Sequence, residues 1–312
     1  MKETVLLVVD MEGCCGIYDM NDKEDCKQKM IDEVDFVISE LNQVGYKDIT
    51  VLDCHNDGMT LKSYCQNHGL SFVNHLWSLN GQVRYSFALL VGFHGKAGAG
   101  GYFPHTIRQE INSMYMGNNC IGEVSLVINY LSYYDIPVVY VGGDKSIEQE
   151  LMKYQGVFYA TKTEGVQSLF LPEQKSFLSQ AIICSLKAPR STYYIDQQVA
   201  IKLRNDEDLK FIPREEFVCR DGLVLFSNTI ELINKMKLFC AYLNISAQYH
   251  YLRIKSLSNK IKACIKSEPV SSDERILKLL YTANTRDFTD DDFAYLTQFA
   301  TLSREVNECQ TN

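Results

Sequence analysis

Five residues of the types that bind zinc follow apolar, strand-like segments or stand at the start of a helical one. They are Asp10 and Glu12 in VVDMEG, His55 in LDCHND, His94 in VGFHGK, and Glu123 in IGEVSL. Imidazole nitrogens and carboxylate oxygens are the ligands of hydrolytic zinc sites, which keep one coordination position open for water. Five such residues are enough to bind two zinc ions. Together they predict a metal-dependent hydrolase with two Zn2+ per chain.

His105 differs from these five residues because it follows a glycine-rich loop, in the segment HGKAGAGGYFPHT. This loop lacks the GK[ST] ending and the GxGxxG order of phosphate-binding loops, so we interpret its glycines as letting the backbone fold over the site. We predict that His105 faces the metals without binding them. A neutral imidazole there can transfer a proton near pH 7 or hold an oxyanion. A capping or packing role is the alternative.

The apolar segments indicate an α/β fold that positions these residues. Four apolar runs predict the buried strands of a largely parallel sheet, at 4–9, 49–53, 86–92 and 137–142. Helical spacing of apolar residues predicts flanking helices at about 27–44 and 121–134.

Asp10, His55 and His94 each follow the end of a predicted strand. The carboxyl ends of the strands in an open α/β sheet border the crevice where ligands bind. Three separate segments therefore deliver polar groups to one edge of one sheet. Glu123 lies in the first turn of its predicted helix, where the helix dipole favours a carboxylate.

Composition and charge exclude several classes of partner. The 312 residues carry a net charge of −8 without a cluster of Lys or Arg, which argues against nucleic acid. The apolar run at 4–9 is too short for a signal peptide or a membrane span, and no uninterrupted apolar stretch of about eighteen residues occurs elsewhere. Eleven cysteines without CxxC pairs indicate reduced thiols. We expect a cytoplasmic protein.

These motifs together resemble the zinc-dependent D-aminopeptidase family of the DppA type. The resemblance rests on VDMEG at 9–13, D-x-H at 53–55, G-[FY]-H at 92–94, H-[ST] at 105–106 and GE at 122–123. It extends through DIPVVYVGGD at 135–144 and, more weakly, through VAIKLRN…IPREEFVCRDG at 199–222, and so covers roughly 3–243.

The resemblance implies a role for each candidate residue. Asp10 would bridge both zinc ions. Glu12 and His94 would complete one zinc site, His55 and Glu123 the other, and His105 would be the catalytic residue that binds no metal. Two such ions can share one water and lower its pKa towards neutrality, which yields a metal-bridged hydroxide. Family members release N-terminal D-residues from short peptides and assemble into ring-shaped homodecamers.

The resemblance also suggests how the chain is divided. We expect a metallo-aminopeptidase-like region at 1–243, with an α/β core at about 1–150 and a smaller α+β part in the remainder. Residues 244–312 are predicted to form a helical C-terminal extension, with helices that begin near Ser272 and Thr289.

Two other functions remain open. One is a di-zinc amidase or esterase that acts on a specialised small molecule, which a panel of amino acid amides and esters would distinguish from a peptidase. The other is a non-catalytic, ring-forming scaffold that only retains the fold. A degenerate scaffold is expected to lose at least one site residue, whereas this chain has all six.

Overall fold

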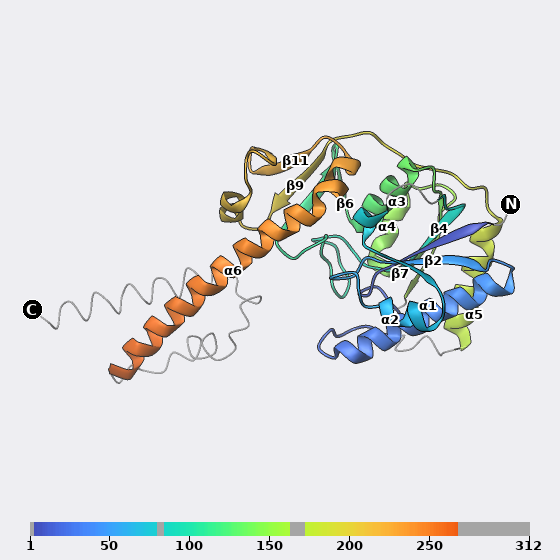
Figure 1. The fold of residues 1–312 in the computed structure, drawn as a ribbon, viewed down its shortest axis with the longest axis horizontal. Coiled ribbons are helices and arrows are strands. Elements are labelled where there is room, and N and C mark those ends of the chain that lie inside the picture. The colour runs from blue at the N-terminus through green and yellow to red at the C-terminus, as the bar shows by residue number, and fades with distance from the viewer. Residues whose placement is uncertain (1–2, 80–83, 163–171, 268–312) are drawn as a thin grey trace, which may run out of the picture. The chain divides into compact units, whose positions relative to one another are not determined.

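The structure, a computed structural model, describes residues 3–79, 84–162 and 172–267 (Figure 1). The chain divides into two compact units, residues 1–239 and residues 240–312. All six candidate site residues lie in the first unit.

The first unit is built on a six-stranded sheet in which every neighbouring pair of strands is parallel. The strand order is β3-β2-β1-β4-β7-β8. The strands are β1 (Thr4–Val9), β2 (Asp48–Asp53), β3 (Ser71–Asn74), β4 (Phe87–Phe93), β7 (Val138–Asp144) and β8 (Phe158–Lys162). All residues of β4 and β7 are buried, as are all but the first residues of β1 and β2. The predicted parallel sheet is therefore confirmed.

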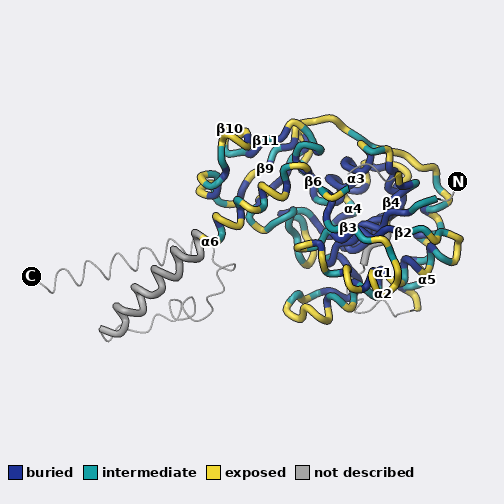
Figure 2. Tube along the Cα trace, viewed as in Figure 1, coloured by how far each residue is buried: buried dark blue, intermediate teal, exposed yellow. Residues whose placement is uncertain are grey.

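Helices cover both faces of this sheet (Figure 1). They are α1 (Lys23–Gln43), α2 (Lys62–Asn67), α3 (Glu123–Tyr133), α4 (Glu148–Leu151) and α5 (Pro172–Lys187), with short 3-10 helices η1 (Leu76–Ser78) and η2 (Lys145–Ile147). Val5, Leu7 and Val9 of β1 join a core cluster with apolar residues of α1 and α5, and α3 lies on the opposite side. Figure 2 shows buried residues concentrated in the sheet between these layers.

The two predicted helices differ slightly from the observed ones at their starts. α1 begins earlier than predicted because Asp22 caps it, with Oδ1 accepting a hydrogen bond of 3.1 Å from the N–H of Asp25. α3 begins later than predicted because the residues just before it form β6 (Asn119–Ile121).

A smaller, antiparallel sheet completes the first unit. Its order is β10-β11-β9-β5-β6, from β5 (Ile111–Met116), β6, β9 (Val199–Leu203), β10 (Val218–Arg220) and β11 (Leu223–Phe226). A 3-10 helix, η3 (Asp206–Phe211), follows β9. Phe217, Phe226 and Phe239 pack against one another, with ring centroids 5.8 to 6.0 Å apart. The smaller part is therefore built on a second sheet, in which residues 111–121, placed by the sequence analysis in the α/β core at about 1–150, pair with strands from 199–226.

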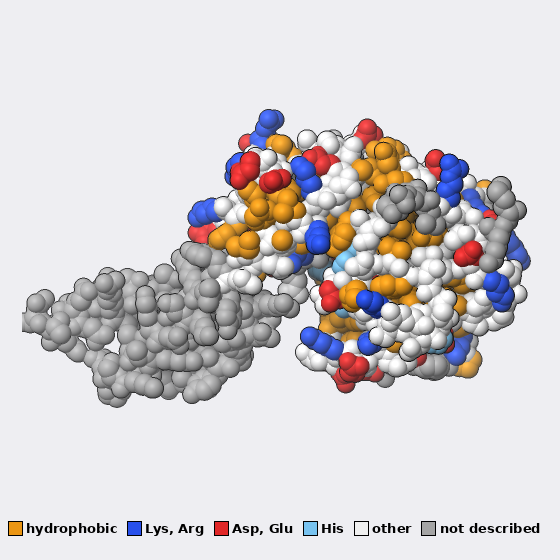
Figure 3. Space-filling view, in the orientation of Figure 1, with side chains coloured by type: hydrophobic (Ala, Val, Ile, Leu, Met, Phe, Trp, Pro, Cys, Tyr) orange, Lys and Arg blue, Asp and Glu red, His pale blue; other side chains and the backbone are white. Residues whose placement is uncertain are grey.

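The second unit is described only in part. The long helix α6 (Thr229–Ser267) provides its residues 240–267. The helices predicted near Ser272 and Thr289 lie outside the described residues. Among the described helices, none combines the length and the apolar character that a membrane span requires. On the face shown in Figure 3, acidic, basic and apolar side chains are interspersed over the described residues.

Candidate metal centre

Asp10, Glu12 and His94 lie at the carboxyl ends of two neighbouring strands. Asp10 and Glu12 follow β1, and His94 follows β4 directly. The loop after β1 stays attached to β4, because the N–H of Asp10 donates to the carbonyl of Val91 at 2.9 Å and the N–H of Gly13 donates to that of Gly92 at 2.8 Å. Pairing between the strands therefore places these side chains.

The close approach of these backbones requires glycine. A Cβ at Gly13 would lie 1.8 Å from the carbonyl oxygen of Phe93, and one at Gly143 would lie 2.0 Å from the same oxygen. Gly92 has a φ of +76°, and its Cβ would lie 2.1 Å from the carbonyl oxygen of Asp10. The region around Asp10 and His94 can close only because these positions lack side chains.

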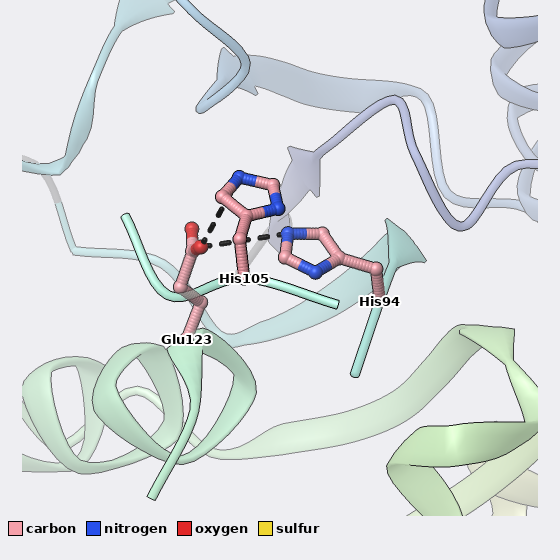
Figure 4. Close-up of side chains that lie close together, drawn as sticks. All are labelled: His94, His105 and Glu123. Carbon is pink, nitrogen blue, oxygen red and sulfur yellow. Dashed lines mark ion pairs between the residues drawn. The ribbon is translucent and has the colours of Figure 1, made fainter. Parts of the chain in front are cut away.

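His94 is the centre of the cluster. Its Nε2 atom lies 3.3 Å from Oδ2 of Asp10 and 3.4 Å from Oε1 of Glu123. Two groups of side chains each have ligand atoms within 4.8 Å of one another, Asp10 with Glu12 and His94, and His94 with His105 and Glu123. Figure 4 shows the second group, in which both imidazoles face the carboxylate of Glu123.

His55 is held beside this cluster by the loop that follows β2. Asp53, the last residue of β2, is fully buried, and its two carboxylate oxygens accept hydrogen bonds from the N–H groups of His55 and Leu61, at 3.1 and 2.9 Å. The Nδ1 atom of His55 lies 3.3 Å from Oγ1 of Thr60. The other ring nitrogen, Nε2, is 3.7 Å from Oε1 of Glu12. Asp53 therefore fixes both ends of the loop that carries His55.

The rings of His94 and His105 are stacked nearly parallel, with centroids 4.1 Å apart and an interplanar angle of 5°. The Nδ1 atom of His94 is 3.0 Å from the carbonyl oxygen of Gly95, and that of His105 is 3.0 Å from the carbonyl oxygen of Phe103. Because a carbonyl oxygen only accepts hydrogen bonds, each Nδ1 carries a hydrogen. Both Nε2 atoms are therefore the ones directed at the carboxylates, as metal ligands or proton carriers.

Glu123 is oriented by the segment that follows His105. Its Oε1 atom accepts a hydrogen bond of 2.6 Å from the N–H of Ile107. Ile107 has a φ of 63°, a left-handed conformation that is strained for a β-branched residue. Two residues earlier, Nε2 of His105 lies 4.0 Å from the same Oε1 atom. The strained residue thus links the candidate catalytic histidine to the candidate ligand.

Burial and the mutual charges of the cluster shift the pKa values of its members. Burial alone would lower the pKa of His94, but the hydrogen bond to Glu123 and the charge of Asp10 raise it to about 10. Burial opposes ionisation of Glu123, yet its hydrogen bond to His94 and the charge of that ring lower its pKa to about 2. Burial and the adjacent Glu12 carboxylate raise the pKa of Asp10 well above its usual range. A bound cation would therefore have to displace protons from the cluster.

The donor set fits a divalent cation such as zinc. Oδ2 of Asp10 is buried and has no hydrogen-bond partner among the described residues, and its ion pair with Nε2 of His94, at 3.3 Å, is the contact that a bound cation would replace. Carboxylates and imidazoles whose Nε2 atoms face them are ligands that zinc accepts. The fit rests on the chemistry and proximity of these side chains.

The structure brings all six predicted site residues together, with pairings that match the sequence analysis only in part. The group of Asp10, Glu12 and His94 agrees with one zinc site implied by the resemblance. The other implied site joins His55 to Glu123, whereas the measured contacts place His55 next to Glu12 and Glu123 next to His94. The distribution of ligands between two ions and the unligated state of His105 stay predictions.

Three residues to which the sequence analysis assigned no role hold the candidate ligands in place. They are Asp53, Ile107 and Thr106, whose buried Oγ1 accepts a hydrogen bond of 3.0 Å from the N–H of Ala97 in the glycine-rich loop. For Asp53 the sequence offers a signal, because an acid ends an apolar strand two residues before a histidine. The conformation of Ile107 has no comparable local signal.

Comparison with known sequences identifies the family. The sequence model of the D-aminopeptidase family matches residues 1–169, more than half of the chain. The chain belongs to the D-aminopeptidase family. The family membership predicted from the motifs is therefore confirmed, and with it the assignment of the chain to the peptidases.

A curated sequence and a solved structure, both of a D-aminopeptidase from Bacillus subtilis, extend the match of this D-aminopeptidase family member. The D-aminopeptidase of Bacillus subtilis (strain 168) is 23% identical over 214 residues, which cover 65% of this chain and 74% of that protein. The solved structure of the Zn-dependent D-aminopeptidase DppA from Bacillus subtilis, described as a self-compartmentalizing protease, superposes with a TM-score of 0.67 at 20% identity. The match covers 77% of this chain and 98% of that one, which shows that the fold is shared.

Proposed function

We propose that this chain is a di-zinc aminopeptidase that removes an N-terminal D-amino acid from short peptides. The observation that carries the proposal is the convergence of three carboxylates and three imidazoles at the carboxyl edge of the parallel sheet. Asp10, Glu12, His55, His94 and Glu123 would hold the ions. The family and the zinc dependence of the Bacillus subtilis relative support this assignment.

Bound zinc ions would supply a Lewis acid and a water of lowered pKa. The residues of the chain supply the rest. The carbonyl of Phe103 holds the hydrogen of His105 on Nδ1, which leaves the lone pair of Nε2 free to take a proton from the attacking water. The resulting imidazolium can then stabilise an oxyanion or give that proton to the departing amine. Nε2 is 3.9 Å from Oε1 of Glu12 and 4.0 Å from Oε1 of Glu123, so this nitrogen faces the carboxylates of the candidate metal centre.

The charges of the site bear on how a free amino terminus would be bound. Asp10, Glu12 and Glu123 contribute at most three negative charges, fewer than the four positive charges of two zinc ions. A substrate amino terminus would therefore be held as the neutral amine, whose lone pair a cation can accept. Recognition of a free amine supports removal of single terminal residues rather than cleavage within a chain.

Metal analysis combined with a substrate panel tests the proposal. Protein purified without chelator should contain about two zinc ions per chain. Mass spectrometry of a panel of dipeptide stereoisomers should detect cleavage of those with a D-residue at the amino terminus. Cleavage of esters or specialised amides alone would favour an amidase or esterase, and absence of both zinc and hydrolysis would favour a non-catalytic scaffold.

We further propose that the protein works as a ring-shaped homo-oligomer, with residues 1–243 as the catalytic region and residues 244–312 as a helical extension. The self-compartmentalizing description of the Bacillus subtilis relative supports this assembly. Light scattering of the full chain tests it. A decamer would have ten times the chain mass of 35.7 kDa, whereas a mass of one chain would contradict the proposal.

A further inference from the structure

The helix that carries Glu123 has no side-chain cap of its own. Its N-cap residue is Gly122, and no side chain at that position bonds the first turn. A Cβ at Gly122 would lie 2.8 Å from Cβ of Lys96 and 2.9 Å from Oε2 of Glu150. The serine, threonine or aspartate that usually caps a helix therefore does not fit at this position.

Glu150 provides the missing cap from another helix. It belongs to α4, 9% of its surface is exposed, and its Oε1 atom accepts hydrogen bonds from the N–H of Gly122 at 2.8 Å and of Ser125 at 3.1 Å. These two N–H groups lie on either side of Glu123. In an ordinary capping box two side chains satisfy these donors, whereas here one buried carboxylate satisfies both.

The cap is important because the two N–H groups that it bonds flank Glu123. Free N–H groups at a helix start attract carboxylates, and Glu123 is the acidic residue in the first turn of α3. Glu150 already occupies the donors of Gly122 and Ser125. The carboxylate of Glu123 instead bonds the N–H of Ile107 and faces His94.

From this geometry we infer that Glu150 is a positioning residue, which holds the first turn of α3 so that Glu123 stays available as a zinc ligand. The inference rests on the proposed function, because it takes Glu123 to bind zinc. Glu150 contacts neither substrate nor metal in this role. It acts through the backbone on both sides of Glu123.

Three substitutions of Glu150 separate the effect of side-chain length from the effect of charge. Glu150→Gln keeps an oxygen at the same distance but loses the charge. Glu150→Asp keeps the charge but is one methylene too short to reach both N–H groups, and Glu150→Ala removes both properties. Gln149→Ala, an exposed neighbour in α4, serves as the control for disturbance of that helix.

The readouts are zinc affinity, measured by competition with a chelating dye, and hydrogen exchange of the first turn of α3 in zinc-free protein. We expect Glu150→Asp and Glu150→Ala to lower zinc affinity roughly 10- to 100-fold, the usual effect of losing a group that supports a metal ligand. Both variants should also exchange the amides of Ser125 and Leu126 faster. Glu150→Gln and Gln149→Ala should stay close to wild type in both measurements.

Several outcomes would overturn the inference. Wild-type zinc affinity in Glu150→Asp or Glu150→Ala, with about two zinc ions in the wild type, would overturn it alone and leave the proposed function intact. A large loss of zinc affinity in Glu150→Gln, with no loss in Glu150→Asp, would also overturn it. The negative charge of the side chain, and not its length, would then determine zinc binding. A wild-type protein that binds no zinc would overturn the proposed function together with this inference. If Glu150→Ala does not fold, the Asp and Gln variants decide the matter.

Discussion

The candidate site has two halves that are held in place by different means. Asp10, Glu12 and His94, which we call the strand-end group, follow β1 and β4 and are positioned by backbone contacts between those strands. His55, His105 and Glu123, the loop-and-helix group, stand on segments held by a few hydrogen bonds each. Those bonds involve the side chains of Asp53, Thr106 and Glu150 and the backbone N–H of Ile107.

The difference shows which half of the candidate site is positioned by the overall fold itself. Backbone pairing in the centre of a buried sheet opens only on global unfolding, whereas loops fixed by a few hydrogen bonds open at lower cost. We expect substitutions near the strand-end group to affect folding and metal binding together. Substitutions near the loop-and-helix group should leave the fold intact and change the chemistry of the site.

Removal of Asp10 should have the largest effect, because its Oδ2 atom lies beside His94 at the centre of the cluster. Asp10→Ala is expected to lower turnover by at least about 10^3-fold, the scale on which enzymes lose activity with a central group. Zinc content should fall as well. Metal analysis and hydrolysis of a D-alanyl amide measure both, with Asp25→Ala, at an exposed position of α1, as control. An Asp10→Ala variant with full zinc content and full activity would show that Asp10 is not a ligand of the metal centre.

His105 tests the loop-and-helix group next. We expect His105→Ala to retain zinc and to lower kcat by about 10^2- to 10^4-fold, the usual contribution of a general acid or base. Parallel measurement of zinc content and of kcat separates two roles. Zinc loss in this variant would instead make His105 a ligand with His94 and Glu123, whose ligand atoms lie within 4.8 Å of its own.

Gly13 tests whether the strand-end group depends on close packing of backbones. Gly13→Ala puts a Cβ 1.8 Å from the carbonyl oxygen of Phe93, so the variant is expected to lose about 3 kcal/mol of stability. Thermal unfolding of zinc-free protein measures this change. Gly100→Ala is the matched control, because its Cβ would meet nothing within 4 Å. Equal melting temperatures for the two variants would show that the strand-end group does not depend on close packing of the backbones at Gly13.

Thr106 should give the smallest effect. Thr106→Val keeps the shape of the side chain but leaves the N–H of Ala97 without its acceptor, which costs about 1 kcal/mol. We expect a drop in kcat of about fivefold, the equivalent of that energy, with little change in KM. Thr106→Ser retains the hydroxyl and should restore kcat. Identical kcat values for the Val and Ser variants would show that the hydroxyl does not hold the loop.

The same division explains how much could be predicted from the sequence. The strands that end at Val9 and Asp53 were predictable because buried parallel strands are continuous apolar runs. The late start of α3 was not, because β6 forms only by pairing with β5. The cap from Glu150 was equally hidden, since it comes from 28 residues beyond Gly122 in the chain. Local pattern predicts the strands, whereas the orientation of Glu123 and the start of its helix depend on contacts between residues 16 to 28 positions apart.

The pairing of β5 with β9 has a consequence for synthesis on the ribosome. β5 ends at Met116, shortly after His105 and Ile107, and it pairs with β6 on one side, but its antiparallel partner on the other side, β9, begins only at Val199. Strand pairs that are far apart in sequence form late, because a long loop must close first. A nascent chain that has emerged only to residue 169 carries every candidate ligand but lacks this partner. We therefore expect hydrolytic competence to arise only once translation has passed β9, so that unfinished chains stay inert towards cellular peptides.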